Sequence, residues 1–252
     1  MTPSSKISVE IVVDCVASAR AAERGGATRV ELCSSLIEGG ITPSAGLIEL
    51  TRAAVSIGIF VMIRPRGGDF HYDADEFELM QRDIAVAKRL GADGVVFGLL
   101  DVNGNVDTAR THQLVGLARP LGVTFHRAFD MTPDLSRALE DICEAGVDRI
   151  LTSGGEQTAP QGCEAIAKIV QQARGRIAIM PGSGVKPQNA RALVEQTGVK
   201  EIHAGLRSSF PSPMLYRNPR ISMGAAEDRE YQRFVLLEEN VRKLCDAVAY
   251  TG

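Results

Sequence analysis

Ionisable side chains recur near the ends of short apolar runs in this sequence. Side chains alternate along a β-strand, so residues two positions apart share a face. Glu31 therefore lies on the same face as Cys33, and Arg64 on the same face as Arg66. The set combines acidic, basic and imidazole groups: Glu10, Glu31, Arg64, Arg66, His126, Arg127 and His203.

Such groups are costly to bury on apolar strands, so we expect them to gather where the strands meet solvent. A pocket that mixes acids, bases and histidine is typical of a binding or catalytic site. It predicts that Glu10 or Glu31, together with His126, moves protons. The structural alternative is an ion-pair network that closes the core, for instance Glu31 with Arg64.

Two arginines follow the apolar run over 59–63 in the sequence Arg64-Pro65-Arg66-Gly67-Gly68. Two guanidinium groups on one face suit a carboxylate or a phosphate, because each offers a planar fork of donors. We predict that Arg64 and Arg66 hold an anion. The plainer interpretation of this stretch is a solvated turn.

His126 ends another apolar run and is followed by Arg127 and Asp130. Histidine is the natural acid or base near neutral pH, and we expect Asp130 to orient or charge it. Arg127 is expected to help hold the anion. A core histidine satisfied by hydrogen bonds is the alternative.

Two glycine-rich turns follow later apolar runs, one containing Gly154 and Gly155 and the other Gly182 and Gly184. The second turn leads into Pro187, a favourable first residue of a helix. Free backbone N–H groups beside a helix N-terminus suit a phosphate, although glycines also serve simple tight turns.

Cys33 and Met62 supply soft sulfur atoms close to these groups. Soft sulfur selects Cu(I), so Cys33 is a candidate copper ligand. The default role of a single cysteine is that of a small buried hydrophobe.

One repeated phrase shows how these residues are positioned. A helix-like stretch ends at Gly, one or two small or polar residues follow, and an apolar run begins; the phrase starts at Gly26, Gly91, Gly146 and Gly198. The copies alternate with further strand candidates over 7–13, 59–63, 123–126 and 177–180. About eight strand–helix units in one chain predict a closed (β/α)₈ TIM barrel, whose chemistry lies at the C-terminal ends of the strands.

Helix patterns fill the gaps between these strands, over 17–24, 44–55, 73–90, 107–118, 133–145, 164–173, 187–195 and 227–248. A doubly wound open sheet is the main structural alternative. The number of units favours the barrel, as does the lack of Gly-x-Gly-x-x-Gly after the first strand.

Composition narrows the class of protein further. The 252 residues suit one barrel domain over 1–252, and a net charge of -3 argues against a nucleic-acid partner. No apolar run approaches the ~20 residues of a membrane span, so no membrane partner is expected. The five scattered cysteines argue against a disulfide framework and fit the cytoplasm.

A Pro- and Arg-rich segment over 207–224 interrupts the alternation before the last helix. It mixes apolar residues such as Phe210 and Tyr216 with Arg217, which suits an interface or a lid. We expect a homo-oligomer, most simply a two-fold dimer.

Several stretches resemble the signature sequences of the CutC family: those over 31–40, 61–70, 124–130, 151–155 and 179–182. The resemblance runs from about Val9 to at least Ala226. It implies a cytoplasmic, oligomeric (β/α)₈ barrel with a role in copper homeostasis, in which Cu(I) is bound through cysteine. Family members often have cysteine in the first strand where this chain has Val12, so only Cys33 of the proposed copper pair is present.

Two functions follow as expectations. The first is a CutC-like protein that binds copper. The second is an enzyme of unknown reaction on a small phosphorylated or carboxylated metabolite, with Arg64, Arg66 and Arg127 on the anion. A scaffold that works only through its surface is disfavoured by the charge at the strand ends.

Overall fold

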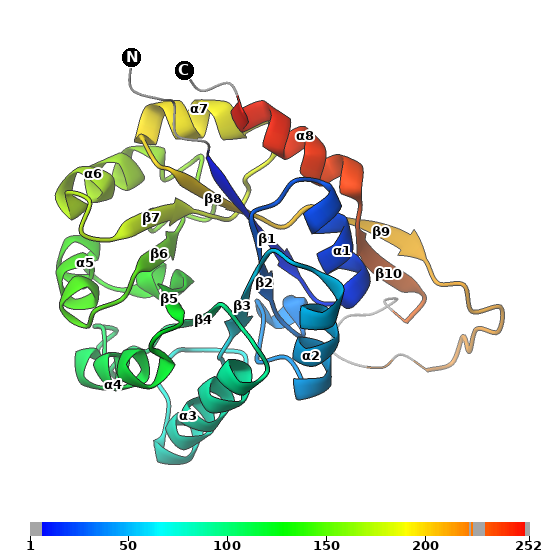
Figure 1. Ribbon diagram of the computed structural model, residues 1–252, viewed down its shortest axis with the longest axis horizontal. Coiled ribbons are helices and arrows are strands. Elements are labelled where there is room, and N and C mark those ends of the chain that lie inside the picture. The colour runs from blue at the N-terminus through cyan, green and yellow to red at the C-terminus, as the bar shows by residue number, and fades with distance from the viewer. Residues whose placement is uncertain (1–6, 222, 224–229, 250–252) are drawn as a thin grey trace.

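The computed structural model describes residues 7–221, 223 and 230–249, and its centre is a ring of eight parallel strands (Figure 1). They are β1 (Ser8–Val13), β2 (Arg29–Leu32), β3 (Gly58–Met62), β4 (Gly94–Phe97), β5 (Gly122–Phe125), β6 (Arg149–Thr152), β7 (Ala178–Pro181) and β8 (Glu201–Ala204). The hydrogen-bonded order is β7-β6-β5-β4-β3-β2-β1-β8, and β7 and β8 lie against each other to complete a nearly closed barrel. The predicted TIM barrel is confirmed.

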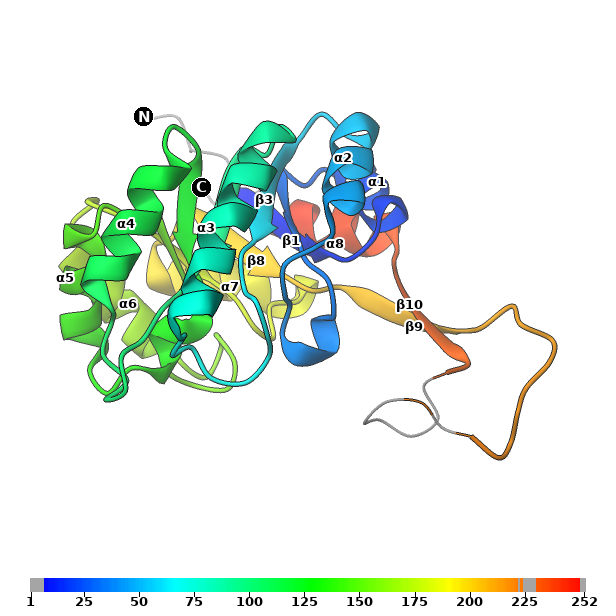
Figure 2. The ribbon, with the colours of Figure 1, turned by 90° about the horizontal axis from the view of Figure 1, so that it is seen from below.

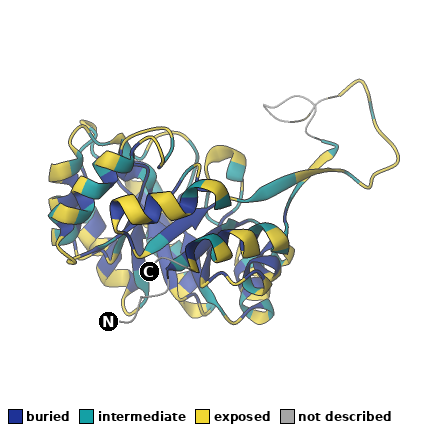
Figure 3. Ribbon diagram, turned by 90° about the horizontal axis from the view of Figure 1, so that it is seen from above, coloured by how far each residue is buried: buried dark blue, intermediate teal, exposed yellow. Residues whose placement is uncertain are grey.

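Helices alternate with the strands and surround them. They are α1 (Val16–Arg24), α2 (Ala45–Ala54), α3 (Ala74–Arg89), α4 (Thr108–Ala118), α5 (Leu135–Glu144), α6 (Cys163–Ala173), α7 (Pro187–Thr197) and α8 (Glu238–Ala249), with short 3₁₀ turns η1 (Leu36–Glu38) and η2 (Arg127–Met131). Figure 3 shows the buried strands inside and the exposed outer faces of the helices. None of the described helices is long and apolar enough to cross a membrane.

The repeated glycine phrase opens every second strand, as predicted. Gly26, Gly91, Gly146 and Gly198 all have positive φ, between 72° and 96°, a conformation that glycine adopts without a Cβ penalty. The strands β2, β4, β6 and β8 begin three residues after these glycines. Local backbone chemistry therefore sets the period of the barrel.

The last predicted helix, over 227–248, is wrong in its first part. Gln232–Leu236 forms strand β10, which pairs antiparallel with β9 (Arg207–Pro211), and α8 begins at Glu238. Residues 227–229 lie outside the described residues. The run of Phe234, Val235 and Leu236 favours a strand because β9 is available as its partner.

Much of the segment over 207–224 accordingly belongs to a two-stranded arm, which projects from the barrel in Figure 2. Residues 222 and 224 lie outside the described residues. The arm begins directly after β8. Its first residue, Arg207, therefore lies at the C-terminal ends of the strands, which we call the barrel mouth.

The interior of the barrel is partly ionic. Arg29, Arg149 and Glu201 are each the first residue of their strand, so they lie at the end of the barrel opposite the mouth. Arg29 and Arg149 stack on the ring of Phe60 at 5.3 and 5.2 Å from its centroid. The expectation that charged groups gather at the late ends of the strands therefore does not hold for Arg29, Arg149 and Glu201.

Candidate functional site

A cavity of about 510 Å³ opens at the C-terminal ends of the strands. It brings together six of the predicted site residues: Glu31, Arg64, His126, Arg127, Gly184 and His203. Parallel strands turn residues at equivalent register positions toward the same interior, and all eight strands end at this face. We call this cavity the mouth pocket.

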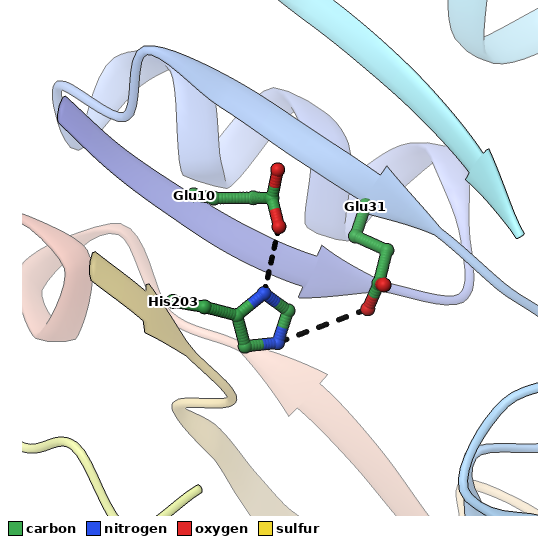
Figure 4. Close-up of side chains that lie close together, drawn as sticks. All are labelled: Glu10, Glu31 and His203. Atoms are coloured by element: carbon green, nitrogen blue, oxygen red, sulfur yellow. Dashed lines mark hydrogen bonds and ion pairs between the residues drawn. The ribbon is translucent and has the colours of Figure 1, made fainter. Parts of the chain in front are cut away.

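Glu10, His203 and Glu31 form a chain of side chains inside the barrel, with the imidazole between the two carboxyl groups (Figure 4). Glu10 pairs in register with His203 on β8 and with Arg29 on β2. His203 Nδ1 donates to Glu10 Oε1 at 2.8 Å, and His203 Nε2 lies 3.7 Å from Glu31 Oε2. Glu31 Oε1 is buried and has no hydrogen-bond partner among the described residues.

The pKa values of the Glu10 and Glu31 carboxyl groups are shifted in opposite directions. Burial disfavours the Glu10 carboxylate, but the hydrogen bond from His203 and the charge of Arg29 outweigh it and lower the pKa of Glu10 to about 2. For Glu31, burial and the nearby Glu10 charge outweigh the attraction of His203 and raise its pKa to about 7. Burial opposes the imidazolium of His203, yet Glu31 and Glu10 outweigh that effect and raise its pKa. Glu31 therefore holds or releases a proton near neutral pH.

Glu10 is held by arginine from the end of the barrel opposite the mouth pocket, and it does not line that pocket. Arg29 donates from Nε to Glu10 and from Nη2 to Glu201, at 2.5 Å in each case, and Arg149 also pairs with Glu201. An ion-pair network is thus present, but with other partners than Glu31 and Arg64. Glu10 does not line the pocket; it contacts His203 there and acts on Glu31 through its charge.

Arg64 is 5% exposed and makes no salt bridge with any described residue. Its guanidinium donates to the backbone carbonyls of Glu38 (2.6 Å), Gly40 (3.0 Å) and Gly68 (2.9 Å), while Nε has no partner within the described chain. Buried charges are normally paired, so this guanidinium has room for an anion. Its pairing with Glu31, given above as an alternative, is not found.

His126 is also buried; its ring centroid lies 4.9 Å from that of Phe70 with the rings tilted by 53°, and the Arg64 guanidinium lies over the same Phe70 ring. Burial and the Arg64 charge lower the pKa of His126 to about 3. The predicted contact with Asp130 is wrong. Asp130 instead accepts from Arg127 Nε (2.8 Å) and from the backbone of the turn after β6, so its carboxylate shapes that loop.

The remaining predicted anion ligands do not all converge. Arg66 turns to Glu76 (2.6 Å) and Asp69 (3.1 Å), outside the mouth pocket, because the loop after β3 folds back on α3. Gly155 donates to Asp130, and Gly154 packs so closely that a Cβ would lie 2.5 Å from the Gly162 carbonyl. A Cβ on Gly182 would meet Leu151 at 2.4 Å, so these three glycines serve packing and turns.

Cys33 is fully buried in an apolar cluster with Phe60, Met62 and Val96, and Val12 packs against it. Burial raises the pKa of the Cys33 thiol well above its usual range, and the charges of Glu31 and Glu10 add to this effect. Met62 also lines the mouth pocket. The side chains of Cys33 and Met62 therefore lie together beside the mouth pocket, with Met62 forming part of its wall.

A separate group of side chains in the barrel offers oxygen and nitrogen donors for a metal. Atoms of Glu10, Glu31 and His203 lie within 4.8 Å of one another. Glu10 is already held by Arg29 and His203, so Glu31 and the Nε2 atom of His203 are the free donors of this group. A histidine whose Nδ1–H is fixed by a carboxylate is oriented as metal-binding histidines are.

Sequence reasoning did not single out Phe70, Ser183 and Arg207 as members of this pocket. Arg207 pairs with Asp14 at 3.1 Å and stacks on Phe234 of the arm. Its position directly after the last barrel strand is the signal that could have identified it.

Comparison with known proteins identifies relatives over nearly the whole chain. Residues 7–208 match the model of the CutC family. The family protein CutC of Chromobacterium violaceum is 47% identical over 240 residues, which are 95% of this chain and 97% of that protein. The mouse copper homeostasis protein cutC homolog is 50% identical over 218 residues, covering 86% of this chain and 80% of that protein. A solved CutC structure from Streptococcus agalactiae is 34% identical with a TM-score of 0.75, and the match covers 79% of this chain and 98% of that one.

Proposed function

The chain belongs to the CutC family, and we propose that it serves copper homeostasis, the role in the name of its mouse relative, by binding Cu(I) as its cargo. The observation that supports copper is the side-by-side burial of Cys33 and Met62 at the mouth pocket. Thiolate and thioether sulfur select Cu(I) over harder ions. The five free thiols suit a reducing compartment, and a cytoplasmic location is part of the proposal.

Binding must displace the proton of Cys33, because a metal binds the thiolate. Glu31 and Glu10 oppose that thiolate before the ion enters but attract the cation once it is present. We therefore expect Cu(I) affinity to rise with pH. Val12 stands where family members often have a second cysteine, so one ion per chain is the expected stoichiometry.

Anaerobic titration with Cu(I) against a coloured chelator tests this proposal. Wild type should saturate at one ion per chain, and Cys33→Ser should weaken binding by at least ten-fold, since it removes the thiolate. Cys163→Ser, at the start of α6, is the matched control and should bind like wild type. Tight binding that Cys33→Ser leaves unchanged would contradict the assignment.

A second function is favoured by one observation, the buried Arg64 guanidinium with no carboxylate partner among the described residues. We propose that it holds the anionic group of a small metabolite, with Arg127 and Arg207 at the rim of the mouth pocket. Glu31 and His203 are then the groups that exchange protons with this metabolite, steadied by Glu10.

Thermal melts with and without phosphate or sulfate test this second function. Arg64→Ala should lower the melting temperature, because three backbone carbonyls lose their donor, and it should abolish the rise that the anion causes in wild type. Arg66→Ala removes a guanidinium of the same loop outside the mouth pocket and should keep that rise. An anion effect that persists in Arg64→Ala would reject the proposal.

A further inference from the structure

The ring of His126 is held in one orientation and one protonation form. The backbone N–H of Ala128 donates to His126 Nδ1 at 3.2 Å, so Nδ1 is an acceptor and carries no proton. The neutral ring then has its proton on Nε2. A Cβ on Gly98 would lie 2.6 Å from the ring, which shows how closely the backbone packs against it.

The Nε2–H donor that results is buried and has no acceptor among the described residues. His126 is 5% exposed and lines the mouth pocket, so its side chain lies at the wall of a cavity rather than in bulk water. An unsatisfied donor in such a place costs free energy unless a ligand or a water accepts from it. The low pKa of His126, about 3, keeps the ring neutral at any physiological pH.

Arg64 and His126 share one neighbour, Phe70. The Arg64 guanidinium carbon lies 5.0 Å from the centroid of that ring, and the His126 ring lies 4.9 Å from it. The charge and the neutral donor are therefore within reach of one small molecule in the mouth pocket. A neutral imidazole donor beside a fixed positive charge favours an acceptor oxygen next to an anionic group.

We propose that the mouth pocket recognises an anion that carries a carbonyl oxygen close to its charged group, with the anion on Arg64 and the carbonyl accepting from His126 Nε2–H. This inference rests on the second function proposed above and names its ligand class. The carbonyl is preferred over an aliphatic hydrogen at the same place because only an acceptor satisfies the buried donor. The shared chemistry covers 2-oxo carboxylates and ketose phosphates.

The test uses two matched pairs of compounds that differ only in having a carbonyl or a methylene beside the charged end: 2-oxobutanoate with butanoate, and 2-oxopropyl phosphate with propyl phosphate. Isothermal titration of the full chain should show the carbonyl member of at least one pair binding about ten-fold more tightly, the scale of one buried hydrogen bond. The pair that shows this preference tells a carboxylate from a phosphate ligand.

Variants separate this inference from the function on which it rests. His126→Phe should reduce the carbonyl preference to about one-fold while the anion still binds, and His126→Gln, whose amide N–H can donate, should restore part of it. Arg64→Lys should weaken both members of a pair alike. His112→Gln, on the exposed face of α4, is the control and should match wild type.

Two outcomes overturn the inference alone, and a third overturns it together with the second proposed function. Arg64-dependent binding with no carbonyl preference would leave the anion site standing and remove the role of His126. A preference that survives in both His126 variants would place the donor elsewhere. If neither pair binds at millimolar concentration, the second proposed function itself fails, and the inference falls with it.

Discussion

Glu10 and Glu31 are the same residue type on neighbouring strands, yet the barrel shifts their pKa values in opposite directions. Glu10 accepts from both Arg29 and His203, and its buried carboxylate is therefore compensated. The ionisation of Glu31 is favoured by a distant imidazole, the Cys33 thiol and the charge of Arg29, which together do not outweigh its burial and the Glu10 charge. Two carboxyl groups whose pKa values are driven apart are the usual basis of acid–base assignments.

The raised pKa of Glu31 predicts a pH dependence of folding stability. The folded state holds this proton up to about pH 7, whereas the unfolded chain releases it near 4.5, so the free energy of unfolding falls as pH rises between these values. His203, whose pKa is also raised, adds to the same fall as pH rises through its folded value. Glu31→Gln should remove up to about 3 kcal/mol of the total decrease in the free energy of unfolding over this pH range.

Urea unfolding of wild type and Glu31→Gln at pH 5, 6, 7 and 8 measures this effect. Glu49→Gln, which changes an exposed side chain, should keep the wild-type slope. Glu10 has the opposite sign: its lowered pKa gives stability above about pH 4.5 that is lost as pH falls toward 2. Parallel curves for wild type and Glu31→Gln would show that Glu31 ionises normally in the folded protein.

At this scale the sequence predicts which residues face the interior but not which of them touch. Strand alternation correctly places Glu31, Arg64 and His126 at one end of the barrel. It cannot show that Asp130 turns to the loop after β6, since that depends on side-chain rotamers and on backbone donors of a distant segment. The same limit explains why Arg66 was assigned to the anion.

Among the elements, strand and helix positions were largely predictable because their signals are local. Glycines with positive φ end helices, and Asp73 caps α3 with a side-chain bond to Glu76 N. The strand β10 was missed because its pairing with β9 joins residues more than twenty positions apart. A strand whose partner lies far away in the sequence cannot be recognised from hydrophobic periodicity alone.

Packing between strands gives a prediction at the same scale. Gly94 opens β4 against the ring of Phe60, and a Cβ there would lie 2.3 Å from Cε1 of that ring. Because Arg29 and Arg149 rest on the same ring, it cannot move without disturbing the ionic layer. Gly94→Ala should therefore destabilise the fold by about 1–3 kcal/mol, as overpacking does.

Gly116, on the exposed face of α4, is the matched control, since a Cβ there meets nothing within 4 Å. Gly116→Ala should stabilise the protein by up to about 1 kcal/mol through helix propensity. Denaturant midpoints of both variants measure the difference. Equal stability of the two would mean that the Phe60 ring has space to yield.

On the scale of the whole molecule, the arm formed by β9 and β10 is the part that the barrel does not explain. It leaves the barrel directly after β8 and returns just before α8, so both of its ends are anchored in the ring (Figure 2). Its described residues include exposed apolar side chains, among them Leu215 at 98% and Tyr216 at 71% exposure. Apolar surface on a projecting element is costly in water unless another surface covers it.

We propose that a second copy of this chain covers the arm in a two-fold dimer, the simplest closed arrangement. A stable interface needs about 1,000 Å² or more of buried surface, so the barrel flank beside the arm would have to take part as well. Light scattering of wild type at micromolar concentration should give twice the chain mass of 27.0 kDa.

Leu215→Asp should shift the mass to that of the monomer, because a desolvated carboxylate at an apolar contact is unfavourable. Val102→Asp changes another exposed apolar residue, on the loop after β4, and should leave the dimer intact. A monomeric wild type would refute the dimer, and a dimer that persists in Leu215→Asp would place its interface away from the arm.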